Sequence, residues 1–313
     1  QSTFAKVEHA VPMLSLQDVF SQEEVQQFLA KNPDALYCVE DKVDGLSISI
    51  LYQKLEGKND CVLVRALTRG DSRFGEDVTE NVKTISNIPR RLNPDFYLGD
   101  PVLLEVRAEV YMSEADFEAA NERRAVEGKK LFANPRNAAA GMLRTKDVSE
   151  TRKANLKAFV FNVQRIEFAN LNSDMRMFFK RQSHSLVALN RFGFDTVRNF
   201  EARAEEVLEV IKRIGKDRGK LGYWIDGAVV KIDDIALRKT MPDTSKNLGF
   251  AIAFKYEPEK KETVITDIIT QTGRTGAITP VAVFEPILLA GTTVGKATLH
   301  NPEYIKNVLK GIS

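Results

Sequence analysis

The stretch from Cys38 to Ile50 carries three charged residues, Glu40, Lys42 and Asp44, at alternating positions of an otherwise largely apolar segment. β-Branched and apolar residues flank Gly45 on both sides, which predicts two strands joined by a glycine turn. Alternate side chains of a strand lie on one face, so we expect the two carboxylates and the amine side by side. Such a set is costly in an apolar strand unless its members are paired or used in chemistry. The alternative is an exposed edge strand with a solvated charged face.

Two further lysines end apolar runs. Lys231 follows the run from Trp224 to Val230, and Lys255 follows the run from Phe250 to Phe254. A lysine in such a run is unusual unless it is paired or functional. Glu109 lies near the end of a strand that alternation predicts over residues 103–111. We expect one cleft to gather the three lysines and two carboxylates: Lys42, Lys231, Lys255, Glu40 and Glu109.

Two loops supply further candidate ligand contacts. Arg69 follows a strand predicted over residues 61–68, and its planar guanidinium group could hold a phosphate or a ribose. Ser15 and Leu16 precede a helix that the capping box Ser21–Glu24 opens, so their backbone groups could meet a ligand. An ordinary loop arginine and a hydrophobic staple onto the core are the respective alternatives.

A helix that begins at Asn134 carries two arginines on one stripe. Asn134 is a good N-cap, and Pro135 suits the first helical position. Arg136 and Arg144 then lie about 12 Å apart along the helix axis. Small residues between them permit a close approach, which suits contacts with phosphate groups. A solvated pair of helical arginines is the alternative. Amphipathic helices are also expected over residues 175–191 and 201–214.

Composition limits the broad class of protein. The 313 residues, 43% of them hydrophobic, suit about two domains with a sizeable core. A net charge of only +2 announces no nucleic-acid partner, so that inference depends on individual residues. The two cysteines, Cys38 and Cys61, form no C-x-x-C pair and indicate neither a zinc site nor a disulfide framework. No apolar run reaches membrane-spanning length. After Pro258, short strands and glycine turns indicate the beginning of a small β-barrel.

These stretches together resemble the adenylation (nucleotidyltransferase) domain of the bacterial NAD-dependent DNA ligases. The element from Lys42 to Gly45 is shared with the wider superfamily of covalent nucleotidyltransferases. Four further stretches resemble the NAD-dependent branch specifically: residues 13–16, 68–71, 133–141 and 273–280, with residues 299–301 continuing the last of them. Two residues depart from the family pattern, since Ala108 and Ser72 stand where the family usually has glycine.

The resemblance implies an α+β fold. Residues 1–258 would form an ATP-grasp-like nucleotidyltransferase domain of antiparallel sheets flanked by helices, and residues 259–313 the start of an OB-type barrel. It also implies a DNA ligase of replication and repair that seals nicks through a lysyl-AMP intermediate on Lys42. The Lys42 amine must lose its proton to attack, whereas the pKa of free lysine is near 10.4. Lys231 and Lys255 would favour the neutral amine, and Glu40 and Asp44 would oppose it unless they engage the adenine, the ribose or a metal.

Site roles carry over from the family by position. Lys42, Asp44, Lys231 and Lys255 would be catalytic. The NAD/AMP pocket would comprise Ser15, Leu16, Glu40, Arg69, Glu109, Lys231 and Lys255. Tyr223 or Trp224 could stack on the base. Three arginines would contact nicked duplex DNA: Arg136, Arg144 and Arg218.

The resemblance also names the cofactors, the partners and the parts that this sequence lacks. NAD would be the adenylate donor and Mg²⁺ the metal. Zinc is expected only in a part of the protein outside this sequence, and the protein would be a cytoplasmic monomer. Without the family's upstream segment, the chain would bind adenosine nucleotides but adenylate itself poorly with NAD and seal no nicks. Two alternatives remain open: an ATP-dependent polynucleotide ligase or capping-type nucleotidyltransferase, and a non-catalytic nucleic-acid-binding module.

Overall fold

The computed structural model describes residues 4–57, 60–92, 98–169, 175–257, 261–272, 278–289 and 292–299. The expected boundary between residues 258 and 259, the glycine-rich residues 273–277, and His300 and Asn301 lie outside these ranges. The chain divides into two compact units, residues 1–256 and 257–313.

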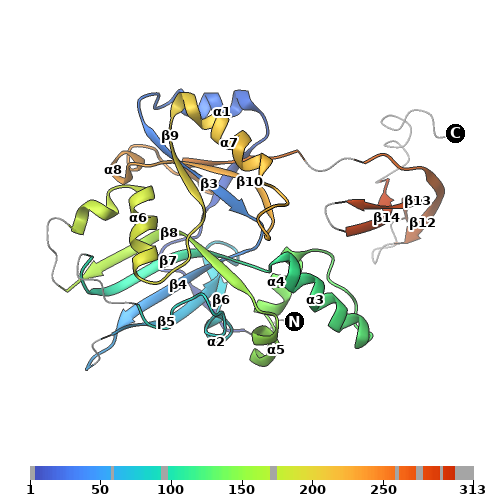
Figure 1. The fold of residues 1–313 in the computed structure, drawn as a ribbon, viewed down its shortest axis with the longest axis horizontal. Coiled ribbons are helices and arrows are strands. Elements are labelled where there is room, and N and C mark those ends of the chain that lie inside the picture. The colour runs from blue at the N-terminus through green and yellow to red at the C-terminus, as the bar shows by residue number, and fades with distance from the viewer. Residues whose placement is uncertain are drawn as a thin grey trace. The chain divides into compact units, whose positions relative to one another are not determined.

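A five-stranded sheet forms one half of the first unit (Figure 1). Its strand order is β2-β11-β10-β3-β9, and every neighbouring pair is antiparallel except β2 with β11, which is parallel. The sheet is therefore antiparallel apart from this one pair. The strands are β2 (Ser15–Val19), β3 (Leu36–Val43), β9 (Asn199–Arg203), β10 (Ile225–Ile232) and β11 (Asn247–Lys255).

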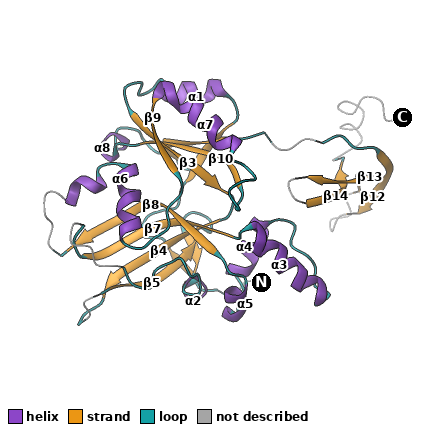
Figure 2. Ribbon diagram, viewed as in Figure 1, coloured by secondary structure: helices purple, strands orange, loops and turns teal. Residues whose placement is uncertain are grey.

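A four-stranded antiparallel sheet of order β5-β4-β7-β8 forms the other half. Its strands are β4 (Leu46–Lys54), β5 (Cys61–Thr68), β7 (Pro101–Tyr111) and β8 (Lys157–Phe168). The turn at Asp44 and Gly45 carries the chain from β3 in one sheet to β4 in the other. Figure 2 shows the strands of the two sheets in orange and the helices around them in purple. The first unit also contains a short antiparallel pair, β1 (Lys6–Glu8) and β6 (Phe74–Glu76).

Helices cover both sheets and create two apolar cores. α1 (Gln22–Leu29) and α7 (Val207–Lys216) pack on the five-stranded sheet. The four-stranded sheet packs against the second group: α2 (Thr79–Val82), α3 (Glu114–Val126), α4 (Pro135–Leu143), α5 (Val148–Lys153) and α6 (Gln182–Arg191). α8 (Ile235–Arg238) follows β10, and 3₁₀ turns cover Met175–Phe179 and Ala204–Glu206.

Local sequence signals explain several helix ends. Ser21 and Glu24 form the expected capping box at the start of α1. The Asn134 side chain accepts from the Asn137 N–H at 2.8 Å, with Pro135 in the first turn, as expected for α4. The two amphipathic helices are only partly as expected. A 3₁₀ turn and α6 replace one helix over residues 175–191, and residues 201–203 belong to β9, because that segment pairs with β3.

The second unit contains a three-stranded antiparallel sheet within its described residues. Its strands, β12 (Ile265–Thr272), β13 (Ile278–Leu289) and β14 (Thr292–Thr298), pair in chain order. This meander of strands agrees with the start of a β-barrel that the composition after Pro258 predicts. Across the described parts of both units, no helix is long and apolar enough to span a membrane.

Candidate active site

A pocket of about 610 Å³ lies in the first unit and takes its lining from both sheets. Nine of the residues expected at the site line this pocket: Ser15, Leu16, Glu40, Lys42, Arg69, Glu109, Arg136, Lys231 and Lys255. Asp44, Arg144 and Arg218 are outside the lining. The expectation of one cleft that gathers three lysines and two carboxylates is therefore met by the geometry.

Lys42 reaches the pocket because its neighbour in the sheet has no side chain. Lys42 on β3 is the register partner of Gly227 on β10. A Cβ atom at position 227 would lie 2.1 Å from the Phe254 carbonyl oxygen and 3.3 Å from the Lys42 Cδ atom. Glycine is thus required at this position by close backbone packing, and it leaves room for the aliphatic part of Lys42.

Asp226 joins Lys42 to Lys255. Its Oδ1 atom lies 3.0 Å from the Lys42 Nζ atom, and its Oδ2 atom lies 2.5 Å from the Lys255 Nζ atom. The three residues come from β3, β10 and β11, which are adjacent in the sheet. One carboxylate between two amines holds both of them at the same side of the pocket.

The two amines differ in their pKa directions. Burial lowers the pKa of Lys42, the nearby charge of Lys255 lowers it further, and Asp226 opposes both effects. Burial is the largest single effect on Lys255 and lowers its pKa, but hydrogen bonds with Asp226 and Lys42 and the charge of Asp226 together raise it. Of the two amines, Lys42 is the one whose neutral, nucleophilic form is favoured.

The carboxylates adjacent to Lys42 in sequence have other partners. Glu40 Oε2 lies 2.7 Å from Lys231 Nζ, and Asp44 Oδ1 lies 2.8 Å from Arg136 Nη1. Opposition to deprotonation of Lys42, expected from Glu40 and Asp44, comes instead from Asp226. Asp226 fills that role because cross-strand neighbours lie closer than alternate residues of one strand.

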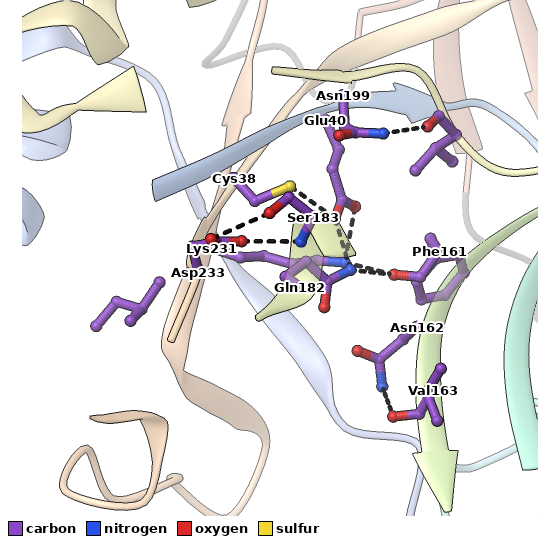
Figure 3. Close-up of polar contacts among 12 residues, drawn as sticks. Cys38, Glu40, Phe161, Asn162, Val163, Gln182, Ser183, Asn199, Lys231 and Asp233 are labelled. Atoms are coloured by element: carbon purple, nitrogen blue, oxygen red, sulfur yellow. Dashed lines mark hydrogen bonds and ion pairs between the residues drawn. The ribbon is translucent and has the colours of Figure 1, made fainter. Parts of the chain in front are cut away.

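A buried polar cluster includes Glu40 and Lys231, which line the pocket (Figure 3). Glu40 and Lys231 are 1% and 5% exposed, and Lys231 also donates to the Phe161 carbonyl oxygen at 2.8 Å. Burial lowers the pKa of Lys231, while Glu40 opposes that effect. The Lys231 Nζ atom lies 5.2 Å from the centre of the Phe161 ring.

Glu109 is held beside the turn between the two sheets. It accepts a short hydrogen bond from the Ser47 hydroxyl, and burial raises its pKa to about 7. A Cβ atom at position 45 would lie 2.2 Å from the Val110 carbonyl oxygen and 3.1 Å from the Glu109 Cγ atom. Gly45 therefore lets the turn pack directly on β7.

Ser15, Leu16 and Arg69 complete the pocket lining, with one correction. Ser15 and Leu16 belong to strand β2, although the sequence predicts a loop there. Their strand pairs with β11, so backbone groups expected to be free are partly used, as in the bond from the Ser15 N–H to the Lys246 carbonyl oxygen at 2.8 Å. Arg69 immediately follows β5, as expected.

The three arginines expected at nucleic acid lie in different settings. Arg136 lines the pocket and bonds Asp44, which raises the Arg136 pKa against the opposing effect of burial. Arg144 forms a two-bond pair with Glu76, at 2.5 Å and 3.0 Å. Arg218 is exposed, with its guanidinium group 5.2 Å from the centre of the Tyr256 ring.

Sequence reasoning missed two features of the site. Asp226 was detectable as an acidic residue inside an apolar strand, the same signal that identified Glu40. Two aromatic residues, Phe161 and Phe250, line the pocket, whereas Tyr223 and Trp224 do not. Tyr223 instead packs against Tyr111, and its hydroxyl donates to Asp41.

Comparisons with known proteins agree with this geometry. The family model described as the NAD-dependent DNA ligase adenylation domain matches residues 1–259, and that of the NAD-dependent DNA ligase OB-fold domain matches residues 262–311. The chain belongs to the NAD-dependent DNA ligase family. The sheet of the second unit is accordingly part of an OB-fold domain, and the fold class predicted from sequence is confirmed.

Curated relatives give the same assignment. Proteins named DNA ligase from Acetivibrio thermocellus, Thermoanaerobacter sp. and Ligilactobacillus salivarius are 46%, 44% and 41% identical, each over 97% of this chain. The chain spans 44% of the length of each of these relatives. An archaeal ATP-dependent RNA ligase structure has 14% identity and a TM-score of 0.41, covering 80% of this chain and 48% of its own, which is too remote to add to the assignment.

The two departures from the family pattern have different structural settings. Ala108 is completely buried in the core of the four-stranded sheet, so its methyl group packs among apolar side chains. Ser72 has a φ angle of 81°, a conformation that favours glycine. Only the second substitution places a residue in a strained backbone conformation.

Proposed function

We propose that this chain carries the self-adenylation chemistry of an NAD-dependent DNA ligase, with Lys42 as the nucleophile. The neutral Lys42 amine attacks the α-phosphorus of NAD. A phosphorus–nitrogen bond forms, the bond from that phosphorus to the bridging oxygen breaks, and nicotinamide mononucleotide leaves with the bonding electron pair. The lysine nitrogen loses its proton and lysyl-AMP remains. The lowered pKa of Lys42 supports this role.

The remaining pocket residues would bind the nucleotide and balance its charge. Lys255 keeps its proton, since its pKa is raised, and would stabilise negative charge on the transferring phosphate. Lys231 would bind the nucleotide together with its partner Glu40. Arg69 and Glu109 would hold the ribose, while Ser15, Leu16 and Glu40 would contact the adenosine half. The Phe161 ring, next to Lys231, is the candidate for stacking on the base.

We propose Mg²⁺ as the accompanying metal. Within the described residues, no group of three or more His, Cys, Asp or Glu side chains could hold a metal ion. Mg²⁺ commonly binds through one or two carboxylates and the substrate phosphates, and such a site fits a pocket whose lining contains the Glu109 carboxylate. When bound, the ion would offset negative charge on the phosphates.

DNA is the proposed acceptor of the AMP group. Arg136 and Arg144 on α4, together with Arg218, would contact phosphates of a nicked duplex, because arginine forks match phosphate geometry. AMP would pass to the 5′-phosphate at the nick, and the 3′-hydroxyl would then displace it, in replication and repair. We further propose that the protein is a cytoplasmic monomer and that the domain boundary lies between residues 258 and 259.

The observation that carries this proposal is the placement of Lys42 against Asp226 and Lys255 in a pocket lined by both sheets. Full-length protein incubated separately with NAD and with ATP should gain one adenylyl group from NAD alone. A gain from ATP instead would favour an ATP-dependent ligase. Binding of nicked duplex without an adduct from either nucleotide would favour a non-catalytic nucleic-acid-binding module.

A further inference from the structure

Gln182 lies one layer behind the pocket, at the start of α6. It is 1% exposed and does not line the pocket itself. Its Nε2 atom donates to Glu40 Oε1 at 2.8 Å and to the Phe161 carbonyl oxygen at 2.8 Å (Figure 3). Gln182 therefore connects α6 to two groups that belong to the pocket wall.

Arg238 fixes the orientation of the Gln182 amide. The Arg238 Nη2 atom donates to Gln182 Oε1 at 3.1 Å, and its Nε atom donates to the Ile232 carbonyl oxygen at 2.8 Å. Arg238 is 8% exposed, so this arrangement is sheltered from water. Because guanidinium can only donate, the Gln182 oxygen must face Arg238 and its NH₂ group must face Glu40.

Glu40 and Lys231 each keep a hydrogen-bonding position that no group of the described residues occupies. Glu40 Oε1 accepts from Gln182 and, more weakly, from the Cys38 thiol at 3.7 Å. Glu40 Oε2 takes one bond from Lys231, and the Phe161 carbonyl takes two, from Lys231 and Gln182. One acceptor site on Glu40 Oε2 and one N–H of Lys231 remain.

We propose that Gln182, held by Arg238, is a positioning residue that sets which nucleotide base the pocket accepts. It does so by fixing the Glu40 carboxylate, which can only accept hydrogen bonds, beside the Lys231 amine, which donates one. This pairing complements a purine with a 6-amino group next to a ring nitrogen acceptor. A 6-oxo purine would place an acceptor against the Glu40 carboxylate. The inference rests on the proposed nucleotide-binding function and adds the residue that determines which base is accepted.

Calorimetric binding of AMP and GMP to the 313-residue chain tests this role. The unsubstituted chain should prefer AMP by roughly a hundredfold or more, since a buried acceptor rejects a mismatched group. Gln182→Leu should weaken AMP binding about tenfold and shrink the preference about tenfold, because Glu40 loses the bond that holds it. Asn81→Leu is the matched control, since Asn81 is 2% exposed and its amide bonds Thr145 and Thr151 away from the pocket lining.

A second variant separates positioning from a merely structural role. Gln182→Glu places two carboxylates together, so one of them binds a proton more readily as the pH falls. The protonated side chain again donates to Glu40. We therefore compare the preference for AMP over GMP of Gln182→Glu with that of the unsubstituted chain at each pH. The ratio of the two preferences should be low at about pH 8 and rise as the pH falls to about 5.5. A structural role alone predicts no such recovery.

The outcomes distinguish this inference from the proposed function. An unsubstituted chain without preference for AMP, or a Gln182→Leu chain that keeps the full preference, overturns the inference. If AMP selectivity responds as stated but full-length protein forms no lysyl-AMP with NAD, the selectivity role of Gln182 stands and the proposed chemistry fails.

Discussion

The Asp226 carboxylate lies 3.0 Å from the Lys42 amine, although 184 positions separate the two residues in the chain. The same carboxylate binds Lys255. Asp226 thus holds one lysine whose pKa is lowered and one whose pKa is raised. This difference in pKa supports the proposal that Lys42 acts as the nucleophile while Lys255 keeps its positive charge.

Removing the Asp226 carboxylate should slow adenylation and shift its pH dependence. Asp226 raises the pKa of Lys42, so Asp226→Asn lowers that pKa. The rising limb of the pH–rate profile should move to lower pH, while the maximal rate falls roughly 10- to 100-fold because Lys42 loses its fixed position. Single-turnover adenylation of full-length protein measures both. Asp100→Asn, which breaks an exposed pair with Lys54, is the control. A shift to higher pH would contradict this role of Asp226.

Glu109 should make the fold less stable as the pH rises. Burial raises its pKa from 4.5 to about 7, so the native state binds the proton more tightly than the unfolded chain does. Its contribution is fully present below pH 4.5 and is lost between pH 4.5 and 7. Glu109→Gln should therefore raise the free energy of unfolding at pH 8, by up to about 3 kcal/mol, and change it little at pH 4.5. Urea unfolding at the two pH values checks this, and equal effects at both would refute it.

The arginines of α4 should act on DNA binding through charge. Arg136→Ala and Arg144→Ala should each weaken binding of full-length protein to nicked duplex at every sequence, and reduce the slope of log affinity against log salt by about one. Arg91→Ala is the matched control, because it also removes an arginine that forms an ion pair with an acidic residue, here the exposed pair with Asp60. Fluorescence anisotropy at several salt concentrations gives the slopes. Unchanged slopes in both α4 variants would place the DNA phosphates elsewhere.

Ser72 is a site where glycine should stabilise the fold. Its φ angle of 81° strains a residue that has a Cβ atom. Ser72→Gly should raise the free energy of unfolding by about 0.5–1 kcal/mol, since relief of strain exceeds the added flexibility of the unfolded chain. Thermal unfolding measures the change. Ser149→Gly, in helix α5 with an ordinary φ, should instead destabilise. If both variants changed the free energy of unfolding in the same direction, strain at Ser72 would be contradicted.

Local signals predicted the elements whose formation depends on neighbours in sequence. The caps at Ser21 and Asn134 are such cases, because their hydrogen bonds close within three residues. Long-range pairing escaped prediction. Residues 201–203 have a helical pattern yet form a strand beside β3, and the parallel pairing of β2 with β11 has no local signature.

The same distinction applies to the site. Lys42, Lys231 and Lys255 were recognisable because a lysine in an apolar strand needs a reason. Their partners were not, since partner choice depends on strand register. Glu40 was expected to act on Lys42 but pairs with Lys231, and the carboxylate that binds Lys42 comes from β10. Gln182 gave no signal at all, because a glutamine at a helix start is ordinary in sequence.

The most direct test locates the adduct. Full-length protein treated with NAD should be digested and the adenylated peptide sequenced by mass spectrometry. The account predicts one AMP group on Lys42, no adduct in Lys42→Ala, and an unchanged adduct when the exposed Lys216 is replaced by alanine. An AMP group on another residue, or one that persists in Lys42→Ala, would contradict it.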